Sequence, residues 1–556
     1  MGILFIILFA LVIFKNLLFW SALWQLKEYR LDRFWDFIKS REGWSSLFNK
    51  SFVFELLALA VLFLFDWLSG MAWRLPLTIF GKQWIFGVGW TSALKFVGIV
   101  FAAELTWFFI SLYRQTFFKP VRTKKVFAVF ASSWLLALAL FYLSWTPVNL
   151  NFAVKSSLAL NLLALPLVGL TILVLYPLSY VLKQRIIKKA KAKIGSQPSL
   201  KVIGVTGSYG KTSVKEFAYQ LIADRLKVFK TAKNNNSEMG VAQTALNHDF
   251  TGDQVFIAEM AAYKKGEIKK ICQICPPNVA VLTGIDQQHS ALFGGQQNII
   301  TAKSEIIGNS KPGAWLILNY DNDFVRQIKL PSDKKVLTYG LDFQPVDLTA
   351  QNIAWRNGQQ SFDLIYQNQR VACQTALLGQ HNILNILAAV GAGLASQLKL
   401  EDLAKNIGKL EPVDRTMKLI EKDGLFLIDD SYNANPSGVL AGLFALTEFK
   451  MPKVIVLDDI LELGEANKAI HQQIAKKLSE LEQVEKIILC GKNFAAIIKK
   501  QLINNNFPAD KIILSSGGRG EGSQYLASLN QTTSKVILFE GRRSQNYLNH
   551  FIKQQA

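Results

Sequence analysis

The residues whose types and spacing most clearly predict chemistry form one short glycine-rich run. It reads Gly204-Val205-Thr206-Gly207-Ser208-Tyr209-Gly210-Lys211-Thr212-Ser213 and lies between a predicted strand and a predicted helix, as a phosphate-binding loop requires. Glycines let backbone N–H groups wrap an anion, and the N-terminus of the helix adds its dipole. Lys211 would reach the outer phosphates of a nucleotide, and the Thr212 hydroxyl would bind Mg²⁺. Because Val205 replaces the first glycine of the usual loop, the run is a variant with glycines three residues apart.

Several further polar motifs follow this loop in a fixed order. They are the asparagine-rich segment Lys230–Gly240, Glu259 at the end of a predicted strand, His289, Lys303, the segment Gly379–Asn382 with Asn385, Arg415, the string Asp429-Asp430-Ser431-Tyr432-Asn433-Ala434-Asn435-Pro436, and Glu462-Leu463-Gly464 with His471. In this order the chain resembles the Mur ligase superfamily from about Val202 to its C-terminus. It is most similar to the branch that adds D-alanyl-D-alanine, and the Asp-Ser-Tyr-Asn-Ala-Asn-Pro string is the most specific part of that resemblance.

The resemblance implies an ATP-dependent ligase that forms an amide bond through an acyl phosphate. ATP would phosphorylate a carboxylate, and an amine would then displace the phosphate. The residues suit this chemistry independently, because a carboxylate attacking a γ-phosphate needs its charge neutralised by lysine and Mg²⁺, with little covalent work for the protein. We therefore expect ATP and Mg²⁺ as cofactors.

Four residues are expected to act in catalysis by this resemblance: Lys211, Glu259, His289 and Lys303. Thr212 and Glu259 offer hard oxygen ligands for one Mg²⁺, and the resemblance places His289 and Lys303 near a second metal. In several branches of the family the matching lysine is carbamylated, which turns a cation into a carboxylate-like ligand. An unmodified Lys303 would instead contact phosphate or substrate, and the sequence leaves both states open.

The resemblance also assigns the residues that hold the nucleotide and the substrates. The nucleotide set comprises Thr206, Gly207, Ser208, Gly210, Lys211, Thr212, Ser213, Asn385, Arg415 and Asp430. Asn385 would contact adenine, whereas Arg415 and Asp430 would contact ribose and phosphates. Substrate contacts are expected from Asn234, Asn236, Ser431, Tyr432, Asn433 and Asn435. Because both halves of the soluble region contribute, we expect them to close over ATP and exclude water from the acyl phosphate.

The elements that position these residues are predicted from the alternation of β-branched runs with helix-like segments after Lys201. The first series of predicted strands covers 201–207, 254–259, 278–285, 314–319 and 334–339, and a hairpin with a turn at Asn357-Gly358 is expected between about 347 and 378. A second series, after Glu411-Pro412, covers 425–429, 453–458, 486–490, 511–514 and 535–539. This pattern predicts an α/β fold: a P-loop ATPase domain with a mostly parallel sheet over 195–410, and a Rossmann-like domain over 411–556.

The first third of the chain is predicted to lie in a membrane. Half of the 556 residues are hydrophobic and 19% are charged, which excludes a disordered protein. Spanning a bilayer takes about 20 apolar residues, and five stretches qualify: Ile3 to Trp24, Phe52 to Met71, Leu94 to Tyr113, Val126 to Trp145 and Ser157 to Leu182. Lys15, Lys95 and Glu104 lie in or near these spans, and we expect them to snorkel or to pair rather than to form a site. Residues 1–194 are thus an expected helical transmembrane bundle with a basic tether.

The basic residues predict the orientation of this bundle. The chain has 62 Lys and Arg against 41 Asp and Glu, a net charge of +21, which suits nucleic acid or an anionic membrane. Successive connections after each span carry 6, 2, 5, 1 and 6 basic residues. This alternation follows the positive-inside rule and favours membrane lipid, with no nucleic acid as partner. It predicts a multi-pass protein of the plasma membrane with its N-terminus outside and its catalytic domains in the cytoplasm.

Departures from the family pattern leave the acceptor open. The family's own N-terminal domain, which holds the uridine diphosphate of the precursor, is not found, and five predicted spans stand in its place. Leu457-Asp458-Asp459-Ile460 replaces a Gly-Asp-Met pattern, Glu540 replaces a common lysine, and Ser237 replaces an asparagine. We expect addition of D-alanyl-D-alanine to a UDP-linked muramyl tripeptide in cell-wall synthesis. The alternatives are a ligase with a lipid-linked or other acceptor and, more remotely, a P-loop-driven transporter, for which no signature helix is found.

Overall fold

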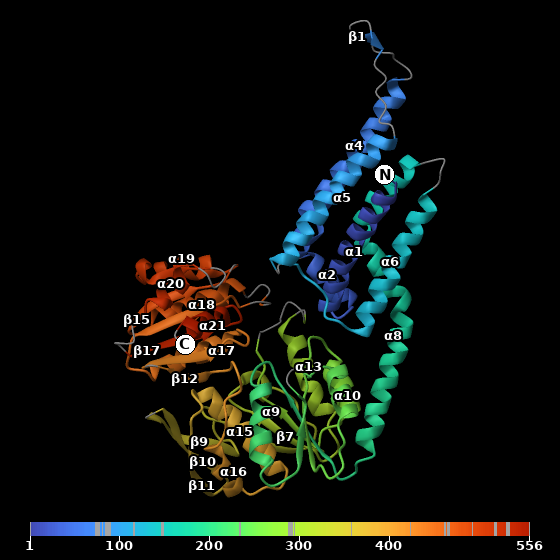
Figure 1. Cartoon of the computed structure of the whole chain (residues 1–556). Helices are drawn as coiled ribbons and strands as arrows, with labels where there is room; N and C mark the ends of the chain where they lie inside the picture. The colour runs from blue at the N-terminus through green and yellow to red at the C-terminus, as the bar shows by residue number, and fades with distance from the viewer. Residues whose placement is uncertain are drawn as a thin grey trace. The chain divides into compact units, whose positions relative to one another are not determined.

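The computed structural model separates into two compact units, Met1–Leu182 and Lys183–Ala556 (Figure 1). Each is described by itself. The structure describes residues 2–554 except 40, 73–77, 80–81, 84–89, 115–116, 146–149, 233–234, 287–292, 294, 357, 423, 461–462, 464–466, 492, 516–519 and 530–533. Within these ranges the backbone alone is described at 41–42, 65, 68–72, 78–79, 82–83, 90–91, 150 and 554.

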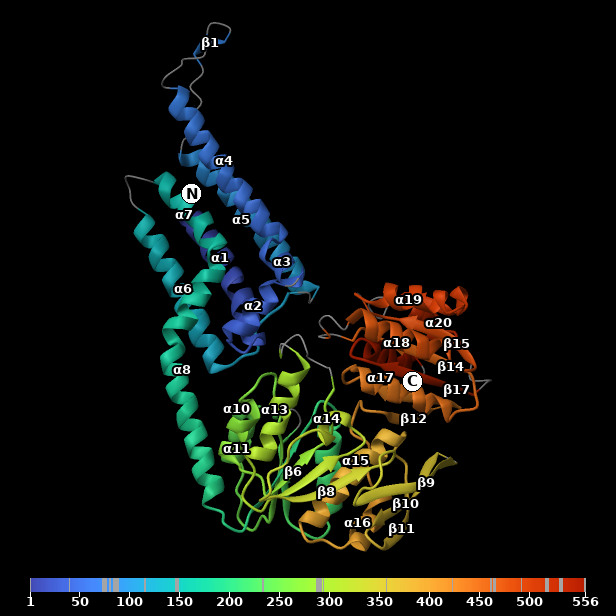
Figure 2. The ribbon, with the colours of Figure 1, turned by 180° about the vertical axis from the view of Figure 1, so that it is seen from behind.

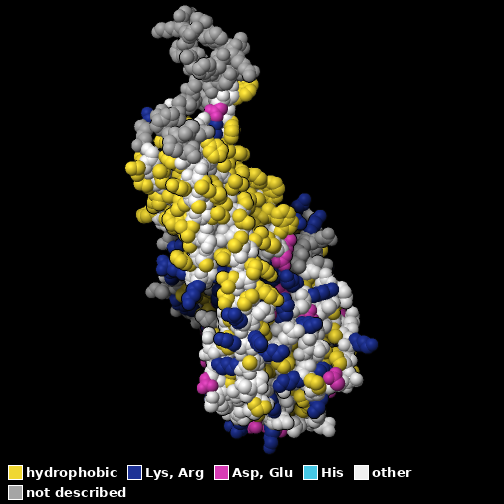
Figure 3. Space-filling view, turned by 90° about the vertical axis from the view of Figure 1, so that its right-hand side faces the viewer, with side chains coloured by type: hydrophobic (Ala, Val, Ile, Leu, Met, Phe, Trp, Pro, Cys, Tyr) yellow, Lys and Arg dark blue, Asp and Glu magenta, His cyan; other side chains and the backbone are white. Residues whose placement is uncertain are grey.

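Long apolar helices make up the first unit. Their residues are hydrophobic on every side, so these helices have no polar face to present to water. Its elements are α1 (Gly2–Leu26), α2 (Leu31–Lys39), α3 (Arg41–Leu47), α4 (Lys50–Ala72), β1 (Thr78–Ile79), β2 (Lys82–Gln83), α5 (Trp90–Tyr113), α6 (Lys124–Ser144), α7 (Leu150–Leu162) and the first part of α8 (Ala164–Gly195). The long helices run side by side (Figure 2). On the face that Figure 3 shows, hydrophobic side chains cover most of this unit.

Four helices among the described residues are long and apolar enough to cross a membrane: Gly2–Leu26, Ser92–Tyr113, Lys124–Ser144 and Ala164–Gly195. The first three match predicted spans. The predicted span Phe52–Met71 lies in α4, part of whose side chains fall outside the described residues. The helices are therefore present where the apolar stretches predicted them, and membrane insertion itself stays a prediction.

The bounds of the fifth predicted span, Ser157–Leu182, are wrong. A turn at Leu163 separates α7 from α8, so the stretch belongs to two helices, and Lys155 lies inside α7 rather than in a connection. The segment after Leu182, predicted as a tether, continues α8 as far as Gly195. Its Lys, Arg, Ala and Ile residues support a helix, and no glycine or proline interrupts it before Gly195.

Two ion pairs join helices of the first unit. Lys15 of α1 and Glu104 of α5 form a buried ion pair with 2.5 Å between Nζ and Oε2. Lys155 of α7 likewise contacts Asp66 of α4. This pairing confirms the expectation for Lys15 and Glu104, since a charge in an apolar bundle is costly unless it is compensated.

A nine-stranded sheet forms the centre of the second unit's first half. Its strands are β3 (Lys201–Thr206), β4 (Val228–Lys230), β5 (Val255–Glu259), β6 (Val279–Leu282), β7 (Trp315–Asn319), β8 (Lys335–Gly340), β9 (Leu348–Arg356), β10 (Gln359–Tyr366) and β11 (Gln369–Thr375). The order is β11-β10-β9-β8-β7-β6-β3-β5-β4, parallel from β4 to β9 and antiparallel across β9, β10 and β11. The predicted hairpin is thus the edge of the same sheet, and β4 is a strand that the sequence did not predict.

Helices cover both faces of this sheet, which explains its nearly continuous apolar strands. On one face lie α9 (Lys211–Ile222), α15 (Gln380–Ala395) and α16 (Leu400–Ile407), and on the other lie α10 (Glu238–Asn247), α11 (Glu267–Ile274) and α13 (Gln296–Gly308) (Figure 2). The short helix α14 (Asp323–Arg326) follows β7. The second hydrophobic core also contains Ala190 and Ile194 from the end of α8.

The second half of this unit is a smaller α/β domain. Its strands are β12 (Lys418–Lys422), β13 (Leu425–Asp430), β14 (Lys453–Leu457), β15 (Val484–Leu489), β16 (Ile512–Leu514) and β17 (Lys535–Glu540), in the order β12-β13-β17-β14-β15-β16. All are parallel except β12, a strand missed by the sequence, which pairs antiparallel with β13. Its helices are α17 (Pro436–Thr447), α18 (Asn467–Ser479), α19 (Ala495–Asn504), α20 (Glu521–Ala527) and α21 (Ser544–Gln554). The parallel sheet agrees with the predicted Rossmann-like fold.

The packing of the end of α8 predicts which shortened chain keeps the second unit stable without the first. A shortened chain that begins at Ser196 loses Ala190 and Ile194, which are 0% and 6% exposed. A buried Ile side chain contributes roughly 1.5–3 kcal/mol and the Ala methyl group about 0.8 kcal/mol, so this chain should be less stable than a chain beginning at Lys183 by about 2–4 kcal/mol. Urea unfolding of both chains measures this difference, and equal unfolding free energies would contradict the account.

Candidate functional site

The glycine-rich loop has the strand–loop–helix setting that the sequence predicted. It leaves the end of β3 and enters α9 at Lys211. Gly207 and Gly210 have φ angles of +150° and +72°, and a Cβ on them would lie 2.0 Å from the Thr283 Oγ1 and 2.5 Å from the Asn385 Oδ1. Only glycine fits both positions. The free N–H groups at the start of α9 are therefore presented to an anion.

Lys211 is folded over this loop. Its Nζ donates hydrogen bonds to the carbonyl oxygens of Gly207 and Ser208, at 2.8 and 3.1 Å. Burial lowers the pKa of the Lys211 amine, and the nearby Glu259 carboxylate opposes that shift. A phosphate at the start of α9 would supply the negative charge that this buried cation needs.

Glu259, at the end of β5, is the buried carboxylate around which the loop is organised. It is 1% exposed. Its Oε2 accepts from the Thr212 hydroxyl at 3.1 Å, and its Oε1 accepts from the Asn236 Nδ2 at 2.9 Å. The structure thus brings together three residues that the sequence assigned to metal and substrate from separate segments.

Lys215 belongs to the same cluster and was missed by the sequence analysis. Its fully buried Nζ lies 3.3 Å from the Glu259 Oε2 and 3.3 Å from the Glu216 Oε1. Lys215 follows Lys211 by four residues on α9, so the two lysines share one face of the helix. That spacing is the signal that could have identified it.

Lys303 approaches the cleft from α13. The residue is 4% exposed, and its amine donates to the Ala262 carbonyl at 3.2 Å and lies 5.7 Å from the centre of the Phe293 ring. Burial, followed by the charge of the neighbouring Lys211, holds the pKa of Lys303 well below its usual value. Its surroundings therefore disfavour the charged form of this amine. The predicted neighbour His289 lies outside the described residues, as does Asn234.

The C-terminal domain contributes Arg415 and Asp430. The Arg415 backbone has a φ of +64°, and its guanidinium donates to the Ser431 carbonyl at 2.7 Å and to the Ser431 hydroxyl at 3.3 Å. Asp430, at the end of β13, accepts from the Met417 N–H at 3.2 Å. Burial raises the pKa of Asp430 to about 7. Both side chains face the nucleotide loop across the cleft.

One cleft of about 1350 Å³ joins these residues. Of the predicted site residues, it is lined by Ser208, Gly210, Lys211, Thr212, Ser213, Asn236, Glu259, Lys303, Asn385, Arg415, Asp430, Tyr432, Asn433 and Asn435. Three other predicted residues do not line the cleft but lie next to residues that do. The Thr206 hydroxyl donates a hydrogen bond to the Met260 carbonyl, Gly207 packs against Thr283, and the Ser431 hydroxyl donates to the Asp429 carboxylate. These three support the cleft without lining it.

A polar link that the sequence did not reveal joins the two halves of the cleft. The Ser437 hydroxyl, in the first turn of α17, donates to the Asp286 Oδ2 at 2.5 Å. The Asp286 N–H in turn donates to the Ser208 hydroxyl at 3.0 Å. The phosphate loop is thereby connected to the C-terminal domain through two hydrogen bonds.

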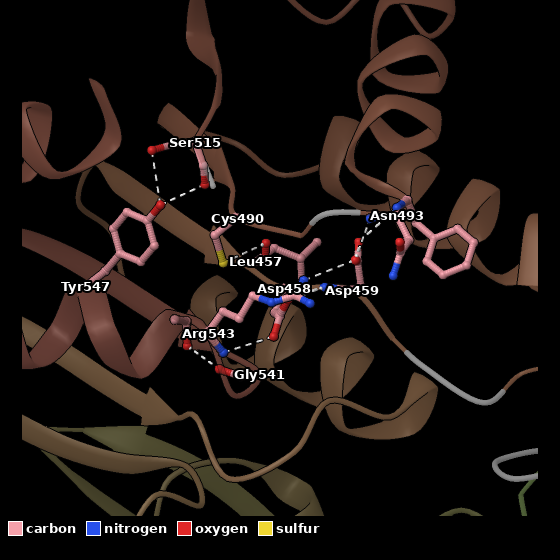
Figure 4. Close-up of polar contacts among 11 residues, drawn as sticks. Leu457, Asp458, Asp459, Cys490, Asn493, Ser515, Gly541, Arg543 and Tyr547 are labelled. Carbon is pink, nitrogen blue, oxygen red and sulfur yellow. Dashed lines mark hydrogen bonds and ion pairs between the residues drawn. The ribbon is translucent and has the colours of Figure 1, made fainter. Parts of the chain in front are cut away.

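The unusual Asp458-Asp459 pair binds Arg543 at the edge of the cleft (Figure 4). The Asp458 carboxylate accepts from the Arg543 backbone N–H at 2.9 Å and from its guanidinium at 3.2 Å. Asp459 accepts from the same guanidinium at 3.3 Å and from the Asn493 and Phe494 N–H groups at 2.8 and 3.0 Å. The two acids therefore fix one arginine at this edge.

Metal-binding groups are sparse in the cleft. Within the part of the chain that the structure describes, no three His, Cys, Asp or Glu side chains are grouped so that they could hold a metal ion. Thr212 and Glu259 supply two oxygen ligands. That small set fits Mg²⁺, which keeps several waters and takes further ligands from substrate phosphates.

Comparison with known proteins agrees with this geometry. Residues 205–393 match the model of the Mur ligase middle domain, and residues 415–542 match that of the Mur ligase, glutamate ligase domain. The two models together cover more than half of the chain.

The similar relatives carry one name. UDP-N-acetylmuramoyl-tripeptide–D-alanyl-D-alanine ligase of Bacillus subtilis is 29% identical over 353 residues, which are 62% of this chain and 73% of that protein. Its Escherichia coli counterpart is 29% identical over 352 residues, 62% of this chain and 77% of that protein.

Two solved structures resemble the second unit. A crystal structure of MurF from Acinetobacter baumannii has a TM-score of 0.61 at 26% identity and covers 67% of this chain and 81% of its own. MurF ligase from Thermotoga maritima in complex with ADP has a TM-score of 0.59 at 29% identity and covers 67% of this chain and 84% of its own.

The ion pair beneath the phosphate loop yields a prediction about stability. Lys215→Met leaves the buried Glu259 carboxylate without this cation, and loss of one partner of a buried pair costs about 3–5 kcal/mol. Adding Glu259→Gln to this variant removes the uncompensated charge and should restore much of the unfolding free energy. Urea unfolding of both proteins measures the difference. A double variant less stable than Lys215→Met would show that the pair is not the source of the loss.

Proposed function

Since this chain belongs to the Mur ligase family, we propose that it is the ligase that uses ATP to join D-alanyl-D-alanine to a muramyl tripeptide in peptidoglycan synthesis. One observation carries the proposal: the phosphate loop, the Glu259–Thr212 pair and residues of the C-terminal domain line a single cleft. The relatives named for this reaction support it. The chain is an ATP-dependent ligase by family, and the identity of its two substrates is the proposal.

ATP fits the cleft from both sides. The N-terminus of α9 and the Lys211 amine would hold the outer phosphates. Asn385, beside Gly210, would contact adenine, and Arg415 and Asp430 would contact ribose and phosphates from the C-terminal domain. The ADP complex of the Thermotoga relative supports a nucleotide in this fold.

The Glu259 carboxylate and the Thr212 hydroxyl would hold Mg²⁺. When bound, the ion would neutralise charge on the phosphates. The precursor carboxylate attacks the γ-phosphorus of ATP, the bond from this phosphorus to the bridging oxygen breaks, and ADP leaves with the electron pair; Lys211 stabilises the charge that spreads over the transferring phosphoryl group. The amine of the dipeptide then attacks the acyl carbon and gives up a proton to solvent, and phosphate leaves with the bonding electron pair as the amide forms.

Lys303 is best explained as a carbamylated residue. Carbamylation joins an uncharged amine to CO₂ with release of a proton, and burial beside Lys211 favours the uncharged form of the Lys303 amine. The product would carry a negative charge and two oxygen ligands near Lys211. It would thereby add an anionic metal ligand where no three His, Cys, Asp or Glu side chains of the described residues are grouped to hold an ion.

Closure of the two domains would protect the intermediate. The cleft is lined by residues from both sheets, and the Ser437–Asp286–Ser208 link ties the start of α17 to the phosphate loop. A nucleotide that engages the loop would therefore favour the closed arrangement, which excludes water from the acyl phosphate.

We further propose that the first unit anchors the enzyme in the plasma membrane, with its N-terminus outside and its catalytic domains in the cytoplasm. Four of its helices are apolar enough to span, and most of the exposed large hydrophobic side chains belong to this unit. After Leu182 such side chains, within the described residues, are Tyr263, Phe343, Tyr432, Phe444, Ile503 and Leu514. An apolar surface of this extent marks an interaction site, and its helical span lengths suit membrane lipid as the partner.

The four helices that are long and apolar enough to span a membrane favour a second acceptor. A lipid-linked muramyl peptide would be held by the bilayer that holds the enzyme. A UDP-linked precursor would have to be bound by the cytoplasmic domains alone. The two acceptors share the same carboxylate chemistry, so the site residues serve either.

The substrate requirement is tested by phosphate release from the full-length protein in detergent. With ATP and Mg²⁺, we expect release when UDP-linked muramyl tripeptide and D-alanyl-D-alanine are added together, and none with either alone. Lys211→Ala should lower this rate by at least about 100-fold, because a preorganised charge at the transition state is lost. Turnover only with a lipid-linked precursor would establish the second acceptor, and turnover without any amine would contradict a ligase.

The state of Lys303 is tested by ¹³C NMR after incubation with ¹³C-bicarbonate. We expect a carbamate carbon signal in the full-length protein that Lys303→Arg lacks, because arginine stays charged and does not react with CO₂. Turnover should also fall when CO₂ is removed from the buffer. A protein that keeps its full rate without CO₂ and shows no carbamate signal has an unmodified lysine.

A further inference from the structure

The C-terminal sheet places two carboxyl groups side by side beneath the cleft. In the parallel pairing of β13 with β17, Asp430 is opposite Glu540. Side chains at paired positions of adjacent parallel strands point to the same face of the sheet. Both residues are the last of their strands, so their carboxyl groups meet at the edge of the sheet that faces the cleft.

Glu540 is enclosed at this position. It is 0% exposed, whereas Asp430 is 9% exposed and lines the cleft. A Cβ added to Gly442 of α17 would lie 3.2 Å from the Glu540 Oε2, so the helix backbone passes directly over the carboxyl group. No N–H or O–H of the described residues donates to either Glu540 oxygen, and the Asp430 carboxyl is within its hydrogen-bonding reach.

The charges around the pair do not neutralise it. Two further carboxylates lie near the pair: Asp429, the neighbour of Asp430 on β13, and Asp458, which follows β14 and is already bound to Arg543. Arg415 donates to Ser431, and α17 carries no titratable side chain. Within the described residues, no lysine or arginine pairs with Asp430 or Glu540. Two ionised carboxylates in contact without a counter-ion would be strongly unfavourable in this buried setting.

A proton is the cation that fits between them. Asp430 lines the cleft but Glu540 does not, so a hydrated metal ion in the cleft could contact Asp430 and could not lie between the two carboxyl groups. Burial followed by the charge of Asp430 raises the pKa of Glu540 well above its usual value, and burial raises the pKa of Asp430 to about 7. The pair therefore holds two protons in acid, one near neutral pH and none in strong base.

We propose that Glu540 is a positioning residue that keeps its proton at neutral pH and donates it in a hydrogen bond to the Asp430 carboxylate, which is thereby fixed for contact with the bound nucleotide. The Met417 N–H holds the other side of the same carboxylate. The nucleotide-binding form then carries one proton on the pair. The inference rests on the proposed role of Asp430 in the nucleotide site and requires no particular acceptor.

The test is nucleotide affinity as a function of pH, measured by isothermal titration calorimetry on the full-length protein with a non-hydrolysable ATP analogue and Mg²⁺. Affinity for the nucleotide should rise as Asp430 ionises. It should fall as Glu540 loses its proton in base, by about tenfold if nucleotide binding shifts the pKa of Glu540 by one unit, since one pKa unit corresponds to a factor of ten. Glu540→Gln keeps the shape and a hydrogen-bond donor but cannot ionise. It should retain the acid limb and lose the alkaline fall.

Glu540→Lys is the matched variant for the acid limb. A cation beside Asp430 favours its charged form, so the rise in affinity should move to lower pH. Titration of the nucleotide and of other cleft residues is common to all three proteins and cancels in the comparison. An alkaline fall that persists in Glu540→Gln, or an acid limb unmoved in Glu540→Lys, would overturn the proposal.

Thermal unfolding gives a second readout that needs no nucleotide. In the unfolded chain Glu540 loses its proton above the ordinary pKa of a carboxyl group. In the folded chain its pKa is raised, so it still holds that proton. Stability of the wild-type protein is therefore lost as pH rises towards the folded pKa. The Tm of Glu540→Gln relative to wild type should increase with pH, and a constant difference would overturn the proposal. An error in the acceptor assigned above would leave both measurements unchanged.

Discussion

The carboxylate of Glu259 is the charge on which the arrangement of the nucleotide side depends. It lies at the end of a buried strand, where an isolated anion would be costly. Three groups from two segments distant from it in sequence supply the compensation: the Thr212 hydroxyl and the Lys215 amine from α9, and the Asn236 amide from the asparagine-rich loop. Fixing these partners also fixes the start of α9 against β5. The phosphate loop is therefore held in shape by the group proposed to bind the metal.

The two sheets bring their chemistry together for one topological reason. Loops and side chains at the carboxyl ends of parallel strands meet at one edge of a sheet. Glu259 and the glycine loop occupy that edge of the first sheet, and Asp430, Asp458 and Glu540 occupy that edge of the second. Acidic groups dominate the second edge. Asp458 and Asp459 share Arg543 as their cation, whereas the Asp430–Glu540 pair has no such partner in the described chain.

Sequence patterns predicted the parts that depend on local order. The glycine loop, the strands on either side of it and Glu259 at a strand end follow from spacing and hydrophobic runs, and the structure has them there. Patterns failed where a contact or a boundary depends on the rest of the fold. β4 and β12 are short edge strands defined by their neighbours. The break at Leu163 has a sequence mark that apolar runs alone do not reveal: Pro166 has no N–H and clashes with the carbonyl four residues earlier, so it begins a new helix rather than continuing α7. The Ser437–Asp286 contact joins residues 151 positions apart, which no local pattern encodes.

The central claim is that the cleft activates a carboxylate by phosphorylation before the amine arrives. Positional isotope exchange tests it most directly, with ATP carrying ¹⁸O in its β,γ-bridge, the muramyl tripeptide present and the dipeptide withheld. The account predicts that ¹⁸O moves from the bridge to non-bridging positions, because reversible acyl-phosphate formation frees the β-phosphate of bound ADP to rotate. Exchange without the tripeptide, or amide formation in a parallel reaction by a protein that shows no exchange, would contradict it.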